Sequence, residues 1–317
     1  MYFVIFTVDN YHSGSGHYAR MKPVAQYLES CGHSASFFFI DKEEGYMRGA
    51  PDVFIIDADT VEYQSKSLSI CSKYRVPIFI VNAKIEMSSP YVTSGAIIAP
   101  FHNITLQVPN CFVDPCFMRA KKHVIGDAIF LNQGASDPWG VMIRIVAALN
   151  AIYQKRDIPL IKCVAGKNVS RSVKAFMKVG LFPMVDPYID IAPAPLSEMI
   201  SSCRLAITAP GQMYSELSVM GIPSLIIGHH KIHDEIGKDL HYKGLAIYLG
   251  CGRDMKDEEL IERLETWAVT KYRLGTTNQI CMDNMANKAK EEAMKFGPEQ
   301  LVEQILNGIW SLDKIKE

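Results

Sequence analysis

The sequence predicts an α/β protein built from two doubly wound domains. Short β-branched or aromatic runs alternate with longer segments of helical period along most of the 317 residues, which is the pattern of repeated βα units. This rhythm stops between Phe101 and His123 and then resumes. A chain of this length has room for two cores of ordinary size. We therefore expect two parallel sheets, in two domains that face a ligand-binding cleft.

The first domain is expected to span residues 1–123. Its strands are read from continuous apolar runs, which are typical where helices cover both faces of a sheet. An expected helix over about 16–30 contains Pro23, which should kink or break it. The expected strands are 2–8, 34–40, 53–57, 77–81 and 95–99, and a second helix is expected over about 63–74.

The second domain is expected to span residues 124–290. Helical segments follow its strands, for example after Trp139 and after Met213. From about Asp257 the chain has a helical pattern to its end, and a final helix within 291–317 is expected to pack back on the first domain. The expected strands are 128–133, 160–165, 204–208, 224–228 and 245–249.

Composition excludes several classes of protein. Hydrophobic residues make up 48% and charged residues 21%, with a net charge of -1 and no basic stripe, so a nucleic-acid partner is not expected. No run approaches the roughly 18 apolar residues of a membrane helix, and the N-terminus lacks a secretory signal pattern. We expect a cytoplasmic enzyme or binding protein without a membrane span.

The eight cysteines do not suggest a metal site or a disulfide framework. The sequence contains no CxxC pair, and Cys111 and Cys116 are the only two that lie close together. Buried, reduced thiols are the simplest reading. No metal and no other cofactor is predicted.

A glycine loop follows the first strand, in "SGSGHYAR" (13–20). A strand, then Gly14-Ser15-Gly16, then a helix allows a tight turn and presents free N–H groups to an anion. A dinucleotide-binding loop has a third glycine where Ala19 stands, although alanine is sometimes tolerated there, and an acid about 20 residues further on, where Asp41 follows the second expected strand. The loop alone therefore leaves NAD and other ligands open.

His17 lies in the first turn of the expected helix, at the sheet edge where open α/β sheets bind ligands. The positive helix end favours the neutral imidazole that a general base needs, although a capping histidine is the alternative. Asp9, just after the first strand, either holds the imidazole or bonds the loop. In "IIDADT" (55–60), Asp57 and Asp59 are sugar contacts, an orienting group for His17, or solvated turn acids.

Three stretches resemble one family in their order and spacing. "VDNYHSGSGHYARMKPVAQYL" (8–28), "NQGASDPWG" (132–140) and "LAITAPGQMYSELSVMGIPSLIIG" (205–228) are similar to the UDP-sugar hydrolases of pseudaminic acid biosynthesis. The wider set comprises two-domain GT-B glycosyltransferases with Rossmann-like domains, including the peptidoglycan enzyme that transfers N-acetylglucosamine to a lipid acceptor. The chain departs from the hydrolases at Lys231, Ile232 and His233, where they tend to have Asp-Asn-Gln.

The resemblance implies attack of water on the anomeric carbon of a UDP-sugar, with inversion, release of UDP and no metal. The catalytic base carries over to His17, and Glu216 occupies a position from which GT-B enzymes commonly bond the ribose. Expected substrate contacts are Asp9, Gly14, Ser15, Gly16, Arg20, Asp57 and His233. Expected nucleotide and phosphate contacts are Gly134, Ala135, Ser136, Asp137, Pro210, Gly211, Gln212, Met213 and Glu216.

The two loops of the second domain also have the sequence features of phosphate-binding helix starts. Asp137-Pro138 has the form of a helix start, and Pro210-Gly211 precedes a second helix whose N-terminus can hold a diphosphate. His229 and His233 have the i, i+4 spacing of a metal pair, but no third ligand is apparent. A polar wall for the ligand is the preferred reading of these histidines.

These observations predict a nucleotide-sugar hydrolase of surface-glycan or nonulosonic acid biosynthesis. A GT-B glycosyltransferase, in which His17 deprotonates an acceptor hydroxyl, is the first alternative. A nucleotide-sugar binding protein without catalytic activity is the second. The sugar, the base of the nucleotide and the oligomeric state are not determined by the sequence.

Overall fold

The structure is a computed structural model, and it divides the chain into two compact units. Unit 1 takes the described residues of Met1–Asn103, Asn110–Val113 and Phe296–Glu317, and unit 2 takes those of Asp114–Lys295. The structure describes residues 1–9, 16–45, 47–58, 60–71, 73–74, 76–81, 92–93, 113–120, 126–155, 157–179, 182–271, 277–295 and 297–313.

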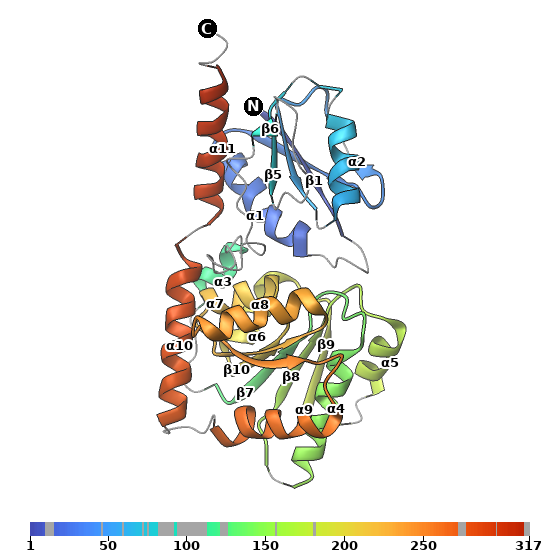
Figure 1. The fold of residues 1–317 in the computed structure, drawn as a ribbon, viewed down its shortest axis with the longest axis vertical. Helices are drawn as coiled ribbons and strands as arrows, with labels where there is room; N and C mark the ends of the chain where they lie inside the picture. The colour runs from blue at the N-terminus through green and yellow to red at the C-terminus, as the bar shows by residue number, and fades with distance from the viewer. Residues whose placement is uncertain are drawn as a thin grey trace. The chain divides into compact units, whose positions relative to one another are not determined.

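Unit 1 contains a sheet, of which β1, β5 and β6 are labelled in Figure 1. Its strand order is β3-β2-β1-β4-β5-β6. All neighbouring strands pair in parallel except the short β3, which runs antiparallel to β2. The strands are β1 (Tyr2–Thr7), β2 (Ser34–Phe39), β3 (Glu44–Gly45), β4 (Val53–Asp57), β5 (Ile78–Val81) and β6 (Val92–Thr93).

Helices cover both faces of this sheet, which explains why its central strands are nearly continuous apolar runs. On one face, α1 (Gly16–Ser30) and α11 (Pro298–Asp313) pack with Phe3 and Ile5 of β1. On the other face, α2 (Val61–Cys71) lies over Val4 and Phe6 of the same strand. Alternate side chains of β1 therefore enter two different cores.

Unit 2 repeats this architecture with the strand order β12-β11-β10-β7-β8-β9, all in parallel. Its larger core lies between the sheet and α4, α5 and α9, and α8 and α10 contribute to a second cluster on the other face. The strands are β7 (Ala128–Asn132), β8 (Ile161–Ala165), β9 (Val185–Ile189), β10 (Cys203–Thr208), β11 (Ser224–Gly228) and β12 (Ile247–Cys251). The helices are α3 (Pro115–Arg119), α4 (Val141–Tyr153), α5 (Arg171–Val179), α6 (Pro193–Ser201), α7 (Gln212–Val219), α8 (Lys231–Tyr242), α9 (Asp257–Leu264), a π-helical segment (Glu265–Lys271) and α10 (Thr277–Ala293).

Most expected strands form within one or two residues of their predicted bounds, but several local features were not predicted, among them the two-residue strands β3 and β6. Strand β9 was not expected, because the Asp186 and Pro187 of its sequence VDPYI are rare in strands; its place at the sheet edge explains why the proline is tolerated. Helix α3 forms inside the expected crossing segment. Pro23 does not break α1, which is helical on both sides of it. The expected strand 95–99 lies outside the described residues.

Each sheet has one point at which the chain reverses its direction of strand addition. In unit 1 this point lies between β1 and β4, and in unit 2 it lies between β7 and β10. Open α/β sheets bind ligands outside the carboxyl ends of the strands at such a point. The loops that follow these four strands are therefore where a site is expected. Within the described part of the chain, no helix is long and apolar enough to cross a membrane.

Candidate functional site

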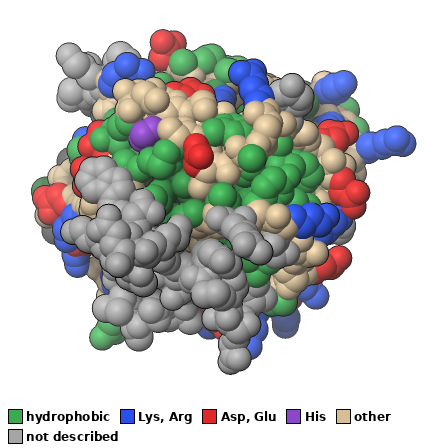
Figure 2. Space-filling model, turned by 90° about the horizontal axis from the view of Figure 1, so that it is seen from above, with side chains coloured by type: hydrophobic (Ala, Val, Ile, Leu, Met, Phe, Trp, Pro, Cys, Tyr) green, Lys and Arg blue, Asp and Glu red, His purple; other side chains and the backbone are tan. Residues whose placement is uncertain are grey.

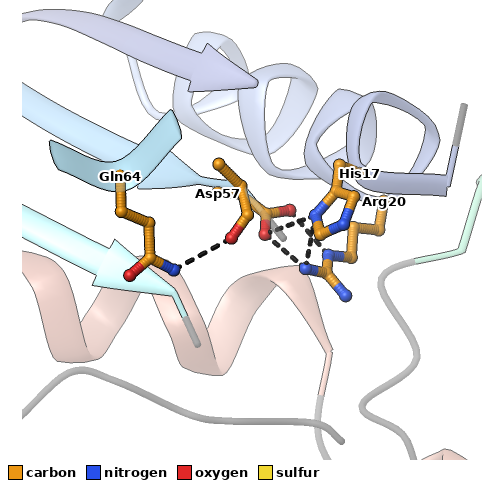
Figure 3. Close-up of polar contacts among 5 residues, drawn as sticks. His17, Arg20, Asp57 and Gln64 are labelled. Carbon is orange, nitrogen blue, oxygen red and sulfur yellow. Dashed lines mark hydrogen bonds and ion pairs between the residues drawn. The ribbon is translucent and has the colours of Figure 1, made fainter. Parts of the chain in front are cut away.

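In unit 1, three side chains meet at the switch point between β1 and β4 (Figure 3). His17 and Arg20 come from successive turns of the start of α1, and Asp57 ends β4. Nδ1 of His17 lies 2.9 Å from Oδ1 of Asp57. Arg20 donates from Nε to Oδ2 of Asp57 at 2.6 Å and from Nη2 to Oδ1. Asp57 thus receives both N–H groups on one side of the guanidinium, in the two-point geometry that favours arginine.

The Asp57 carboxylate is fully buried, and its charge depends on these neighbours. Burial alone would raise the pKa of Asp57, but the charges and hydrogen bonds of Arg20 and His17 outweigh it and lower the pKa to about 2. Asp57 is therefore ionised throughout the physiological range. An ionised carboxylate at Nδ1 orients the imidazole and leaves Nε2 as the reactive nitrogen.

Nε2 of His17 has no hydrogen-bond partner within the described residues, and the side chain is 14% exposed. Behind the group, Gln64 of α2 donates to the carbonyl of Ala58 at 2.9 Å, which ties down the chain just after Asp57 (Figure 3). Because the histidine is held at one nitrogen only, this group can accept or donate one proton at the edge of the sheet.

The other expected residues of the first loop have different surroundings. Asp9 is buried but lies 3.4 Å from Nζ of Lys42, so the carboxylate that holds His17 is Asp57. Gly16 is the first residue of α1. Gly14 and Ser15, like Asp59, lie outside the described residues.

In unit 2, the loop after β7 contains Gly134, Ala135, Ser136 and Asp137 at the second switch point. Gly134 has a φ of 83°, a conformation that favours glycine, and its N–H donates to Oδ1 of Asn132 at 2.8 Å. The carbonyl of Ala135 accepts from Asn168 in the next loop. The loop is thus held on both sides.

Asp137 acts as the cap of α4, but from further away than the sequence suggested. The helix begins at Val141, and the two carboxylate oxygens accept the N–H groups of Val141 at 2.8 Å and Met142 at 3.0 Å. Burial raises the pKa of Asp137 to about 6, against the lowering effect of these two bonds. Both N–H groups are already occupied, so an anion in this loop would have to use other donors.

The loop after β10 contains Pro210 and Gly211 and leads into α7 through Gln212 and Met213. Gly211 caps α7 with extended backbone, and a Cβ placed on it would have open space around it. Glu216, in the second turn, is 8% exposed, and burial raises its pKa to about 8. A neutral Glu216 carboxyl can donate a hydrogen bond as well as accept one.

A cluster of imidazoles follows β11. It contacts Gln133 and Trp139, two residues that the sequence patterns did not identify as part of a site. His229 Nε2 lies 2.7 Å from Oε1 of Gln133, while Nε2 of Gln133 is buried and has no hydrogen-bond partner among the described residues. Trp139, 43% exposed, contacts the rings of His229 and His230. The position of Gln133 directly after β7 was the sequence signal that could have identified it.

The expected substrate residue His233 belongs to the same cluster. Its ring centroid lies 4.1 Å from that of His230 and 5.3 Å from that of His229, and its buried Nδ1 has no hydrogen-bond partner in the part of the chain that the structure describes. Burial lowers the pKa of all three histidines, that of His229 to about 4, so the cluster is polar but uncharged at neutral pH. Among the described residues, no group of three or more His, Cys, Asp and Glu side chains is arranged to hold a metal ion.

A cavity of about 540 Å³ lies in unit 1 at the opposite edge of the sheet from His17. It is bordered by Tyr2 and Ser34, which begin β1 and β2, and by Glu29, Phe37 and Arg48. Figure 2 shows the molecule from above, with hydrophobic side chains over the middle of that face and most Lys and Arg near its margin. The switch-point residues remain the better candidates for a site, because reactive groups converge there.

No protein-family model matches the chain, and no curated protein matches its sequence. Solved structures do match its fold. The spinosyn rhamnosyltransferase SpnG has a TM-score of 0.65 at 14% identity, covering 97% of this chain and 100% of SpnG. A putative UDP-N-acetylglucosamine 2-epimerase from Listeria monocytogenes has a TM-score of 0.59 at 13% identity, covering 100% of this chain and 97% of the epimerase.

A third match is MurG from Acinetobacter baumannii, with a TM-score of 0.57 at 13% identity and coverage of 96% of this chain and 99% of MurG. Together with the two parallel sheets, these likenesses confirm the predicted GT-B fold. At such identities they concern the fold and not the reaction.

Proposed function

We propose that this GT-B chain transfers the sugar of a nucleotide sugar to a hydroxyl group, with His17 as the general base. The observation that carries the proposal is the contact between Nδ1 of His17 and the ionised Asp57 carboxylate, which leaves Nε2 without a partner among the described residues. A base held in this way by a carboxylate is a recurrent device for activating hydroxyl groups.

The chemical step moves one proton and one sugar. Nε2 takes the proton of the acceptor hydroxyl as its oxygen bonds to the anomeric carbon. The bond between that carbon and the diphosphate breaks, and its electron pair leaves with the nucleoside diphosphate. Attack from the side opposite the leaving group inverts the configuration of the carbon.

In this proposal unit 2 binds the nucleoside diphosphate. The support is the position of Gly134–Asp137 and Pro210–Met213 after the two strands that flank the switch point, together with the open space beside Gly211. Glu216 is proposed to bond the ribose. Two solved structures of similar fold are complexes with nucleoside diphosphates, SpnG with thymidine diphosphate and MnaA from S. aureus with UDP.

Hydrolysis of the nucleotide sugar is the second candidate, with water in place of the acceptor. It is favoured by the order of the three motifs at 8–28, 132–140 and 205–228, which resembles the UDP-sugar hydrolases. The first candidate is preferred because SpnG, SpnP and the epimerase of similar fold are named as transferases or epimerases, and none of them as a hydrolase.

The experiment is to measure release of nucleoside diphosphate from a panel of UDP- and TDP-sugars, with and without hydroxylated acceptors. Release that requires an acceptor supports transfer, and release without one supports hydrolysis. In labelled water, hydrolysis at carbon places the label in the sugar, and label in the phosphate contradicts both mechanisms. If no nucleotide sugar of the panel binds or reacts, the proposed function is wrong.

A further inference from the structure

Nδ1 of His17, Oδ1 of Asp57 and Nη2 of Arg20 form a triangle of mutual contacts (Figure 3). Nδ1 lies 2.9 Å from each of the other two atoms. The two neighbours make opposite demands on this nitrogen, since a carboxylate only accepts hydrogen bonds and a guanidinium only donates them. Either Nδ1 carries a proton and bonds Asp57, or it carries none and bonds Arg20.

Geometry favours the bond to Asp57. Arg20 already directs Nε–H and one Nη2–H at the two oxygens of Asp57. The angle that Oδ1 and Nδ1 subtend at Nη2 is acute, whereas the two hydrogens of a planar amino group diverge by about 120°. Nη2 therefore cannot direct a separate hydrogen straight at Nδ1, and its contact with Nδ1 is a bent or shared one. The proton of neutral His17 consequently lies on Nδ1, and Nε2 has a free electron pair.

Removing the charge of Arg20 would change the number of protons that the Asp57–His17 pair binds. Asp57 has no exposed surface, and burial is the largest single influence on its ionisation. Without Arg20, the buried Asp57–His17 pair is stabilised by taking up one proton. That proton makes either a carboxylate beside an imidazolium or a carboxylic acid that donates to Nδ1. In both forms Nε2 carries a hydrogen and cannot act as a base.

We propose that Arg20 is a positioning residue. Its permanent positive charge takes the place of a proton on the Asp57–His17 pair and so keeps Nε2 of His17 unprotonated. The use of Nε2 as a base rests on the proposed function, but the number of protons on the pair does not. Arg20 was expected to contact substrate, and this role assigns it to the carboxylate behind the histidine instead.

No other described side chain near Asp57 supplies a positive charge that could replace that of Arg20. Arg20 and His17 are the charged groups that act on Asp57. Asp9, which lies two residues after β1, pairs with Lys42, and Gln64 of α2 is neutral. On α11, Glu299 and Glu303 act on Tyr27 in the last turns of α1. Within the described residues of unit 1, Arg20 is thus the cation in contact with Asp57.

The test is NMR of the full chain labelled with ¹⁵N-histidine, which distinguishes protonated from unprotonated ring nitrogens. His17→Gln identifies the signals of His17 among the nine histidines. At pH 7 the unmutated protein should show a proton on Nδ1 and none on Nε2. A proton on Nε2 at that pH would overturn the proposal, and this measurement needs no altered arginine.

Three variants then separate charge from packing. In Arg20→Met and in Arg20→Gln, which keeps a donor for Asp57, a clearly larger fraction of molecules than in the unmutated protein should carry a proton on Nε2 at pH 7. Arg20→Lys keeps the charge and should resemble the unmutated protein. Folded neutral variants whose Nε2 stays unprotonated at pH 7 would contradict the proposal.

Activity provides a separate readout once a substrate is known. In Arg20→Gln, kcat should fall at pH 7 and recover partly at higher pH, whereas KM for the nucleotide sugar should change little. If the NMR result holds and no nucleotide sugar reacts, the proposed function fails while the role of Arg20 stands. If turnover is found and Arg20→Gln has an unchanged pH profile, the role of Arg20 fails alone.

Discussion

Oδ1 of Asp57, at the end of β4, lies 2.9 Å from Nδ1 of His17, in the first turn of α1. Forty residues separate the two in sequence, and the parallel pairing of β1 with β4 brings them to one edge of the sheet. The contact joins a fully buried carboxylate to a histidine that is 14% exposed. It therefore connects the interior of unit 1 to its surface.

Replacing Asp57 by asparagine should remove the preference for a proton on Nδ1. The new side-chain amide can donate to Nδ1, and Arg20 can then donate to it as well. Because Nδ1 must be unprotonated to accept either bond, the proton of the neutral imidazole would lie on Nε2. We expect kcat to fall by about 10²-fold or more. Loss of the buried partner of Arg20 should also cost about 3–5 kcal/mol of stability. Thermal unfolding monitored by circular dichroism separates the two effects, and full turnover in a folded variant would contradict the role of Asp57.

Replacing His17 by glutamine should abolish turnover while nucleotide binding remains. A general base typically contributes about 10²-fold to 10⁴-fold to the rate. Because unit 2 is proposed to bind the nucleoside diphosphate, calorimetric titration with UDP or TDP should give an unchanged Kd. His33→Gln is the matched control, since His33 lies at the other end of α1, near the N-terminal amine. Equal loss of activity in both variants would reject the assignment.

Replacing Gly211 by alanine should weaken nucleotide binding without reducing stability. The backbone of Gly211 is extended, a conformation open to any residue, and an added Cβ meets nothing within 4 Å. The methyl group would occupy the space through which a phosphate approaches the start of α7. We expect at least about a tenfold increase in Kd, or about 1.4 kcal/mol.

Gly221→Ala is the control for this experiment. Gly221 has a φ of 67°, so alanine there is strained and should lower stability by about 1 kcal/mol while leaving nucleotide binding unchanged. Unchanged binding by Gly211→Ala would show that the phosphates do not approach this loop.

Glu216 should make the stability of unit 2 depend on pH. Its pKa in the folded state is raised to about 8 by burial, whereas an unfolded glutamate has a pKa of about 4.3. The folded state therefore binds the proton more tightly. The stabilisation that this tighter proton binding gives the folded state is fully present below about pH 4. It is lost as pH rises toward 8, and the free energy of unfolding falls by about 1.4 kcal/mol per unit of pH at most.

Glu216→Gln cannot ionise and should escape this loss. Relative to the unmutated protein, its Tm should therefore rise progressively between about pH 5 and pH 8. Glu198→Gln, at an exposed position on α6, is the control and should show no such trend. A Tm difference that does not vary with pH would mean that Glu216 is ionised in the folded protein.

Much of the fold followed from local patterns. The strands at 53–57 and 224–228 form over the predicted residues, because a buried parallel strand needs a continuous apolar run and these segments have one. Strand β9 escaped prediction because an edge strand can contain a proline and a charged residue, and its sequence therefore resembles a loop. Local sequence patterns therefore predict buried strands well but predict the strands that pair at the edges of a sheet poorly.

The sequence by itself determined the GT-B fold class and the loops that carry the candidate site. Glycines, a histidine and small residues directly after apolar strands identify the carboxyl edges of the two sheets, because side chains there must leave the core. The choice of Asp57 as the partner of His17, and of Lys42 as the partner of Asp9, depended on the tertiary structure. Strand order decides which strand ends are neighbours, and contacts 40 residues apart leave no periodic trace in the sequence.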